Sequence, residues 1–316
     1  MTRLLYALLL LATTATAAPR PNVVIYLADD MGMGDTSAYQ DWSGNPDNAQ
    51  LHTPELERLA RRGIRFTDAH SPHSRCTTTR YALLTGRYCW RTPLKHWVLF
   101  GVQGDPLIEP NRPTIATFLN GHGYRTGMVG KWHVGLTYTR TDGTPADAWH
   151  DADLRQPIAD GPLDHGFDFF HGFSRSHPTS GPDGQKRNTP DQSIGPGWIH
   201  NRTITGATDN GKQLDGSYVL RKIAPTLHQQ ASTFLADSTK PFLLYFASPA
   251  NHTPHTPADQ IAGRPVRGTS KFKNGTPTES ARLDFIYEND VQVGLLLDHL
   301  ENTDDPRNPG HKLIHN

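Results

Sequence analysis

The sequence predicts an α/β fold with a mainly parallel central sheet flanked by helices. Two continuous apolar runs, at residues 22–28 and 241–247, have the composition of strands that are buried on both faces. Segments with the pattern and length of helices lie between these runs and after the second one. Strands that alternate with helices along a chain are typical of parallel sheets, because each crossover between parallel strands needs a long connection.

The first 18 residues predict a secretory signal peptide. Arg3 supplies a positive charge, residues 4–12 are apolar, and the small residues 13–18 offer a small-x-small cleavage site before Pro19. The apolar run is too short to span a bilayer. We therefore expect an exported mature chain, periplasmic or secreted, that starts near residue 19 and has no stable membrane insertion.

The remaining elements are predicted in chain order. Thr53 is suited to cap a helix that has Pro54 in its first turn and ends at Gly63, and residues 64–66 could form a short strand. A helix over residues 114–120 and a strand over residues 125–130 follow. Residues 136–216 are rich in Gly, Pro, Asp and Thr, which indicates long loops or small edge strands over a site.

Two further helices are expected around the second apolar strand. The first covers residues 218–236, where Pro225 would kink or divide it. The second covers residues 282–300 and carries a set of apolar side chains at helical spacing. Residues 302–316 are polar and predict no closing element.

Charge and cysteine content exclude several classes of protein. The chain has 31 basic and 31 acidic residues, and this formal net charge of zero gives no field to bind a nucleic-acid backbone. Two cysteines cannot build a disulfide scaffold or a four-cysteine zinc site. The 17 histidines make the chain a candidate for metal or acid–base chemistry.

Asp29 and Asp30 follow the first predicted strand. Functional groups gather at the carboxyl ends of strands in open α/β sheets, and two adjacent carboxylates there can hold a divalent cation. By itself the pair is equally compatible with a solvated start of a loop.

The segment from Cys76 to Arg87 is more specific. It contains Cys76, then Arg80 four residues later, then a Leu-Thr-Gly-Arg run, and it resembles the sulfatase signature. Further matching pieces follow the order of that family, over roughly residues 21–300. These pieces are Asp29-Asp30, Gly130-Lys131-Trp132-His133 and Asn251-His252-Thr253-Pro254.

The resemblance implies the fold, the reaction and the cofactors. It implies an alkaline phosphatase-like α/β domain that hydrolyses a sulfate ester, on a small molecule or a glycan, to an alcohol and inorganic sulfate. A formylglycine-generating enzyme would oxidise Cys76 to formylglycine during maturation. Calcium would be held by Asp29, Asp30 and position 76, and calcium suits such oxygen ligands.

Roles for the other motif residues also follow from the resemblance. Arg80, one helical turn after Cys76 and on the same face, would fix the hydrated formylglycine and balance charge. Lys131 would bind the sulfate or the hydrate. His133 would take the proton from the second hydroxyl of the hydrate, and His252 would help to protonate the leaving alcohol.

Two departures from the family pattern affect these expectations. Thr78 stands where the signature has proline, so partial conversion of Cys76 is expected. The family has a further Asp-Asn-Gly motif on a later strand, whereas Asp209-Asn210-Gly211 precedes His252 and lies in a loop-like stretch. Residues 19–316 are therefore expected to be the N-terminal catalytic domain, truncated before the second metal-ligand motif and with an incomplete sheet.

Several alternatives remain open at this point. Cysteine arithmetic alone favours a Cys76–Cys89 disulfide in an exported protein. His255 is a rival to His252, three residues later. The alternative functions are a truncated or degenerate homologue that does not catalyse, and a related phosphodiesterase or phosphonate hydrolase.

Overall fold

The computed structural model describes residues 20–39, 51–99, 106–147, 151–179, 197–205 and 217–316. Its strands are β1 (Val23–Leu27), β2 (Arg125–Lys131), β3 (Phe169–Phe173), β4 (Ile199–His200), β5 (Thr203–Ile204), β6 (Phe242–Ala247), β7 (Gln260–Ile261) and β8 (Arg264–Pro265). The main sheet has the order β1-β6-β2-β3-β4-β5. Neighbours among β1, β6, β2 and β3 are parallel, and β4 and β5 continue the sheet antiparallel. The predicted mainly parallel α/β fold is confirmed.

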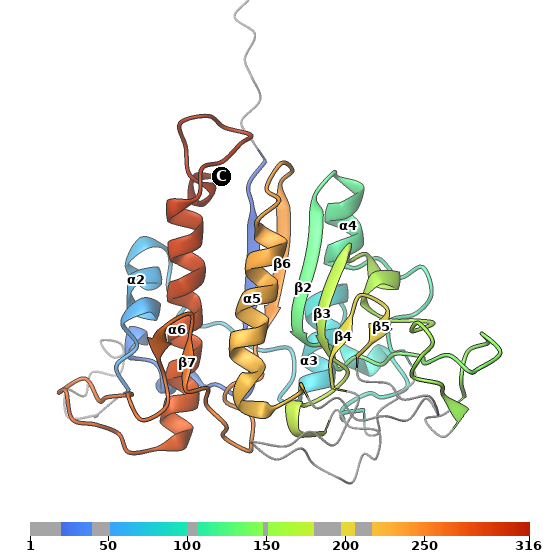
Figure 1. Ribbon diagram of the computed structural model, residues 1–316, viewed down its shortest axis with the longest axis horizontal. Helices are drawn as coiled ribbons and strands as arrows, with labels where there is room; N and C mark the ends of the chain where they lie inside the picture. The colour runs from blue at the N-terminus through green and yellow to red at the C-terminus, as the bar shows by residue number, and fades with distance from the viewer. Residues whose placement is uncertain (1–19, 40–50, 100–105, 148–150, 180–196, 206–216) are drawn as a thin grey trace, which may run out of the picture.

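Helices cover both faces of this sheet (Figure 1). The helices are α2 (Pro54–Arg62), α3 (Cys76–Thr85), α4 (Ile115–Gly121), α5 (Ile223–Leu235) and α6 (Ala281–Asn302), of which α2 packs against α6. Short 3-10 turns lie at Met33–Asp35, Ser37–Tyr39, Cys89–Arg91, Pro162–His165, His177–Thr179, Leu220–Lys222 and Leu313–His315. Within the described residues, no helix combines the length and apolarity that crossing a membrane requires.

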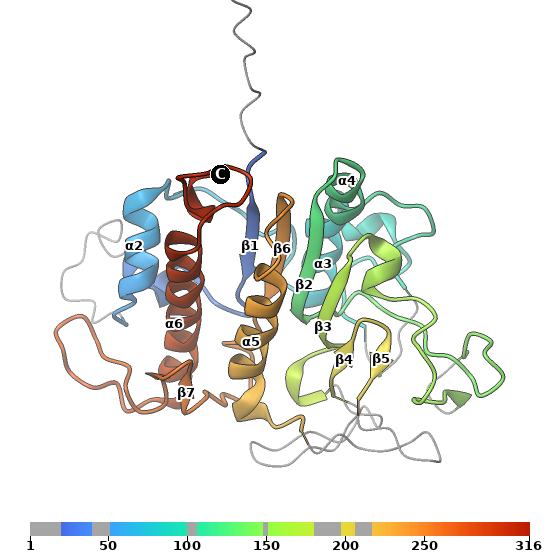
Figure 2. The ribbon, with the colours of Figure 1, turned by 45° about the horizontal axis from the view of Figure 1, so that its top comes forward.

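Alternating side chains of the central strands build two separate cores. On β2, Met128 packs into the core that includes residues of α3 and α4, while Val129 packs into the core that includes α5 and the end of α6. The same alternation continues along β6, whose residues are all buried. Figure 2 shows α5 in front of the sheet, α3 and α4 behind it, and α2 beside α6. Burial on both faces explains why these strands read as continuous apolar runs.

Helix α6 also fixes the loop that follows β6. The Asn289 side chain accepts hydrogen bonds from Tyr26 Oη at 2.7 Å and Ser248 Oγ at 2.8 Å, and its amide donates to Ala250 O at 2.9 Å. Asn289 thereby joins β1, the loop after β6 and α6 through buried polar atoms. A satisfied buried network of this kind makes the relative placement of its elements specific.

Several predicted elements differ from the structure. No strand forms at residues 64–66, where Ile64 and Phe66 are 81% and 65% exposed, because the segment has no pairing partner. Residues 136–216 were expected to hold only loops or edge strands, yet β3 is an internal strand that pairs with β2. Helix α5 begins at Ile223 after a 3-10 turn, so Pro225 sits in its first turn, where a missing N–H removes no helical bond.

The polar C-terminal stretch also differs from the prediction, since residues 313–315 form a 3-10 turn in which Leu313 is buried. Two other predictions lie outside the described residues: the signal peptide at residues 1–18, and the loop-like assignment of Asp209-Asn210-Gly211.

Candidate active site

Three parallel strands and one helix bring the motif residues to the same end of the sheet. Asp29 follows β1, Lys131 ends β2 and His252 lies in the loop after β6. Cys76 is the first residue of α3, so its side chain lies at the amide end of that helix. Parallel strands place their carboxyl ends at one edge, which is the usual position of a site in open α/β sheets.

A buried charge cluster forms the floor of the site. Both oxygens of Asp29 are engaged, with Oδ2 2.5 Å from Lys131 Nζ and Oδ1 3.3 Å from an Arg80 nitrogen. The Arg80 guanidinium also donates to Lys131 O at 2.7 Å. Burial by itself would raise the pKa of Asp29, but the charges of Lys131 and Arg80 outweigh it and lower that pKa. The carboxylate is therefore ionised, and two cations against one anion favour a bound anion.

Cys76 carries a free thiol that burial keeps protonated. Burial raises the pKa of Cys76, although the nearby Lys131 ammonium acts in the opposite direction. Since the thiolate is the reactive form, the unmodified side chain is a poor nucleophile here. No Cys76–Cys89 disulfide forms, and the Cys89 thiol instead donates to Lys95 O at 2.6 Å.

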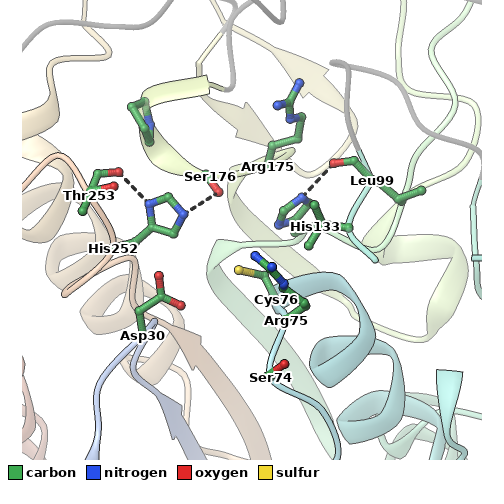
Figure 3. Close-up of a pocket in the computed structure, with 12 residues that line it drawn as sticks. Asp30, Ser74, Arg75, Cys76, Leu99, His133, Arg175, Ser176, His252 and Thr253 are labelled. Carbon is green, nitrogen blue, oxygen red and sulfur yellow. Dashed lines mark hydrogen bonds between the residues drawn. The ribbon is translucent and has the colours of Figure 1, made fainter. Parts of the chain in front are cut away.

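Two histidines lie on opposite sides of Cys76 (Figure 3). His133 Nε2 lies 3.1 Å from Leu99 O, and a carbonyl can only accept, so this nitrogen carries the proton and Nδ1 holds a lone pair. Burial, followed by the charge of Lys131, lowers the pKa of His133 well below its usual value, which keeps the ring neutral. Its Nδ1 is buried and has no hydrogen-bond partner among the described residues.

His252 has the opposite arrangement. Its Nδ1 lies 2.6 Å from Thr253 O, and its Nε2 lies 3.3 Å from Ser176 Oγ. Nε2 therefore faces a hydroxyl that can donate or accept. His255, the rival from the sequence, is absent from the lining of the cavity and packs its ring 6.4 Å from that of Phe285.

A cavity of about 240 Å³ lies above the floor and contains both histidines. Its lining comprises Asp30, Ser74, Arg75, Cys76, Val98, Leu99, His133, Arg175, Ser176, Pro178, His252 and Thr253. A second cavity, of about 300 Å³, extends over Asp29 and Arg80 and shares Asp30, Ser74, Arg75 and Cys76 with the first. The candidate nucleophile position is thus accessible from two sides.

The segment after β3 contributes residues that the sequence analysis missed. Arg175 and Ser176 line the cavity, and the ring of His177 lies 5.7 Å from that of His252. Burial, followed by the charge of His252, lowers the pKa of His177 to about 3, so this neighbour stays neutral. The available signal was the phenylalanine-rich run of β3 followed by Ser-Arg-Ser-His, and the Gly- and Pro-rich surroundings of this run obscured it.

Oxygen donors around Asp29 fit a hard divalent cation. Ligating atoms of Asp29, Cys76 and His252 all lie within 4.8 Å of one another. Asp30 faces the same space in Figure 3, and the neighbouring Asn251 has a buried Oδ1 without a hydrogen-bond partner among the described residues. Carboxylate and amide oxygens are the ligands that calcium takes, and a buried amide oxygen without a partner costs free energy that a cation would recover.

Comparisons with known proteins identify the family. The family model described as Sulfatase matches residues 21–308. Human arylsulfatase G is 30% identical over 302 residues, which cover 91% of this chain and 50% of that protein. Arylsulfatase H of the dog, Canis lupus familiaris, is 37% identical over 164 residues, which cover 50% of this chain and 25% of that protein. The chain therefore spans about half, or less, of the length of these relatives.

A solved structure from a study of glycosaminoglycan metabolism by Bacteroides thetaiotaomicron has a TM-score of 0.65 and 23% identity. The match covers 89% of this chain and 59% of that one, and it shows a shared fold. The family match over residues 21–308 agrees with the order of motifs that meet at the cavity. This chain belongs to the sulfatase family and has its alkaline phosphatase-like fold.

Proposed function

We propose that this protein hydrolyses a sulfate ester to an alcohol and inorganic sulfate. The observation that carries the proposal is the position of Cys76, between a buried cationic floor and two histidines that line one cavity. Sulfate esters resist hydrolysis because their anionic oxygens repel nucleophiles and their leaving alkoxides are poor. A site for this reaction must supply positive charge, a nucleophile and a proton donor.

Lys131 and Arg80 supply the positive charge. Both are almost completely buried, and together they share the single carboxylate of Asp29. The first turn of α3 adds backbone N–H groups at Cys76, where a helix terminus favours anions. Groups fixed by burial need little reorganisation when charge develops on the sulfate oxygens.

The nucleophile in this proposal derives from Cys76, through oxidation by a formylglycine-generating enzyme. Formylglycine supplies an aldehyde hydrate, whose hydroxyl is a better nucleophile for sulfur than a protonated thiol. The free and partly accessible state of Cys76, and the raised pKa of its thiol, support this assignment over direct thiolate chemistry. Arg80 lies one helical turn away and would hold the modified side chain in place.

The two histidines divide the proton transfers. His133 is neutral, and its buried Nδ1 has a lone pair without a partner among the described residues, so it would accept the proton when sulfate is released from position 76. His252 lies across the cavity. Because Thr253 O accepts from its Nδ1, His252 would act in the imidazolium form, in which Nε2 also carries a proton, and donate that proton to the oxygen of the leaving alcohol. Ser176 orients the His252 ring through the contact at that same nitrogen.

Calcium belongs to the proposal through the oxygen donors of Asp29, Asp30 and Asn251 and the side chain at position 76. When bound, the ion would neutralise charge on the sulfate oxygens. The unpartnered Asn251 Oδ1 and the exposed Asp30 carboxylate at the cavity support this donor set.

Export is part of the same proposal, since the first 18 residues have the pattern of a cleavable signal peptide. The substrate would be a sulfated small molecule or glycan. Mass spectrometry of the N-terminus of material collected outside the cytoplasm tests the cleavage. A mature chain that retains residues 1–18 would contradict export by this route.

Conversion of Cys76 and turnover of an aryl sulfate test the proposed reaction. After co-expression with a formylglycine-generating enzyme, the peptide that carries residue 76 should show formylglycine by mass spectrometry. Cys76→Ala should abolish hydrolysis of 4-nitrophenyl sulfate. Unmodified cysteine throughout, or turnover of a phosphate diester without turnover of the sulfate, would refute the proposal.

A second variant tests the departure at position 78. Thr78 is the third residue of α3, and helix residues this close to the N-terminus do not need their N–H for a helical bond, so proline is compatible with the backbone. A proline at this position would lose the hydrogen bond that the Thr78 hydroxyl donates to Arg75 O at 3.1 Å. Thr78→Pro should therefore raise the converted fraction of Cys76.

A further inference from the structure

We propose that the substrate carries a second anionic group beside the sulfate ester, and that Arg75 binds this group. The inference rests on the proposed sulfate ester hydrolysis and narrows its substrate class to compounds with two neighbouring anionic groups. A second sulfate and a carboxylate both present anionic oxygens, to which a guanidinium can donate two parallel hydrogen bonds.

Arg75 occupies the junction of the two cavities at the site. It is the N-cap residue of α3, directly before Cys76, and its side chain is exposed. Arg75 lines both the cavity of about 240 Å³ with the two histidines and the cavity of about 300 Å³ over Asp29. Figure 3 shows Arg75 beside Cys76 at the cavity. This guanidinium therefore lines both cavities that give access to Cys76.

The guanidinium is held in place without losing its donors. Its central carbon lies 4.4 Å from the ring centroid of Trp97, in a cation–π contact. Such a contact uses the flat face of the group and leaves the N–H edge available for a bidentate bond to an oxyanion. Trp97 is 44% exposed, so the pair stands at the rim.

Arg75 has no role in the charge cluster of the floor. Arg80 and Lys131 bind Asp29, whereas no ion pair of Arg75 with a carboxylate occurs among the described residues. The floor already supplies cationic groups for the sulfate that reacts. Arg75 adds a further positive charge at the rim, where it meets a different part of the substrate.

Three sugar sulfates that differ only at carbon 6 test the proposal. They are glucose 4-sulfate, glucose 4,6-disulfate and glucuronic acid 4-sulfate, which carry a hydroxyl, a sulfate and a carboxylate at that carbon. Isothermal titration of the chain with unconverted Cys76 measures binding without turnover. We expect one or both doubly anionic sugars to bind about tenfold more tightly than glucose 4-sulfate.

Variants assign the preference to Arg75. Arg75→Gln should reduce the preference for a doubly anionic sugar to about twofold or less. Arg75→Lys should restore part of it, because it keeps the charge and loses the planar fork. Arg61→Gln is the matched control, since it removes the same charge from an exposed arginine of α2 that lines neither cavity.

The outcomes separate this proposal from the proposed reaction. Equal binding of all three sugars, or equal loss of preference in Arg75→Gln and Arg61→Gln, would overturn the role of Arg75. In that case turnover of 4-nitrophenyl sulfate by converted protein would still support hydrolysis. Conversely, an Arg75-dependent preference without any turnover would leave the subsite supported and the proposed reaction refuted. A preference for the disulfate alone or the glucuronic acid sulfate alone identifies the second anion.

Discussion

His252 is the single residue whose proposed role can best be separated from those of its neighbours. It lies across the cavity from His133, and its proton would matter only for the leaving alcohol. His252→Ala should lower kcat/KM for an alkyl sulfate about a hundredfold or more, the usual scale of general acid catalysis. The loss for 4-nitrophenyl sulfate should be much smaller, because its leaving group needs little protonation.

Steady-state kinetics on both substrates measure this difference, with His255→Ala as the control from the same loop. His255 does not line the cavity, so its removal should affect the two substrates alike and weakly. Equal and large losses on both substrates in His252→Ala would remove the leaving-group role.

At the scale of elements, β2 depends on a glycine immediately before Lys131. Gly130 has φ +104°, and a Cβ at this position would overlap the carbonyl oxygen of Ala247 on β6. Both the left-handed backbone and the close approach exclude a side chain. Gly130→Ala should therefore lower the free energy of unfolding by about 3 kcal/mol or more, beyond the cost of the backbone conformation alone.

Gly143 separates the two causes, because it also has a left-handed φ, +84°, but open space around the position of a Cβ. Gly143→Ala should cost only about 1 kcal/mol. Urea unfolding of both variants gives the comparison. Similar destabilisation in both would show that the contact between β2 and β6 relaxes easily.

Helix α6 carries a buried carboxyl that makes stability depend on pH. Burial raises the pKa of Glu288 to about 8, against the lowering effect of the Ala258 N–H, which donates to this side chain at 2.7 Å. Below a pH of about 4.5 Glu288 is protonated in both the folded and the unfolded state, and its contribution to the free energy of unfolding is fully present. As the pH rises toward 8, Glu288 ionises in the unfolded chain but stays protonated in the folded one, so this contribution to stability is lost.

Glu288→Gln should remove that part of the pH dependence, because the amide stays neutral and still accepts from Ala258. The free energy of unfolding should fall in both proteins between pH 5 and pH 8.5. This fall should be about 2–4 kcal/mol smaller in the variant than in the parent. Asp290, whose pKa burial raises to about 7, changes stability in the same direction in both proteins and cancels in this comparison. An identical pH dependence of the two proteins would mean that Glu288 is ionised in the folded state.

At the scale of the whole molecule, the proposed calcium site joins the ends of β1 and β6 to the start of α3. Among the described residues, Asp29, Cys76 and His252 form the one cluster of three acidic, histidine or cysteine side chains within ligating distance. Calcium prefers six to eight oxygens, and Lys131 and Arg80 already engage both oxygens of Asp29. An entering cation would have to share that carboxylate with two positive side chains.

We therefore expect unconverted chain to bind calcium with a dissociation constant well above 1 μM, about 0.1 mM or weaker. Relative to the parent chain, Lys131→Met should tighten calcium binding by removing the competing ammonium, whereas Asp29→Asn should weaken calcium binding. Calorimetric titration of the three proteins measures this order. Micromolar binding by the parent chain would show that additional ligands complete the site.

Local sequence patterns determined most of the elements. The runs of β1 and β6 are apolar because these strands are buried on both faces, and α2, α4 and α6 start and end within a few residues of the predicted positions. The motifs likewise indicated that Asp29, Cys76, Lys131 and His252 belong to one site, since they lie at the ends of strands, in the loop after a strand or at the start of a helix.

The tertiary structure alone decided the strand order and the contacts of the site. The sequence pattern of a strand shows that the strand is buried but not which strand it pairs with. Only the crossovers place β6 between β1 and β2 and make β3 an internal strand. The charge cluster of Asp29, Lys131 and Arg80 depends on this order, because it joins the ends of β1 and β2 across β6. Ser176 reaches His252 for the same reason: side chains from separate strands meet only after the sheet has assembled.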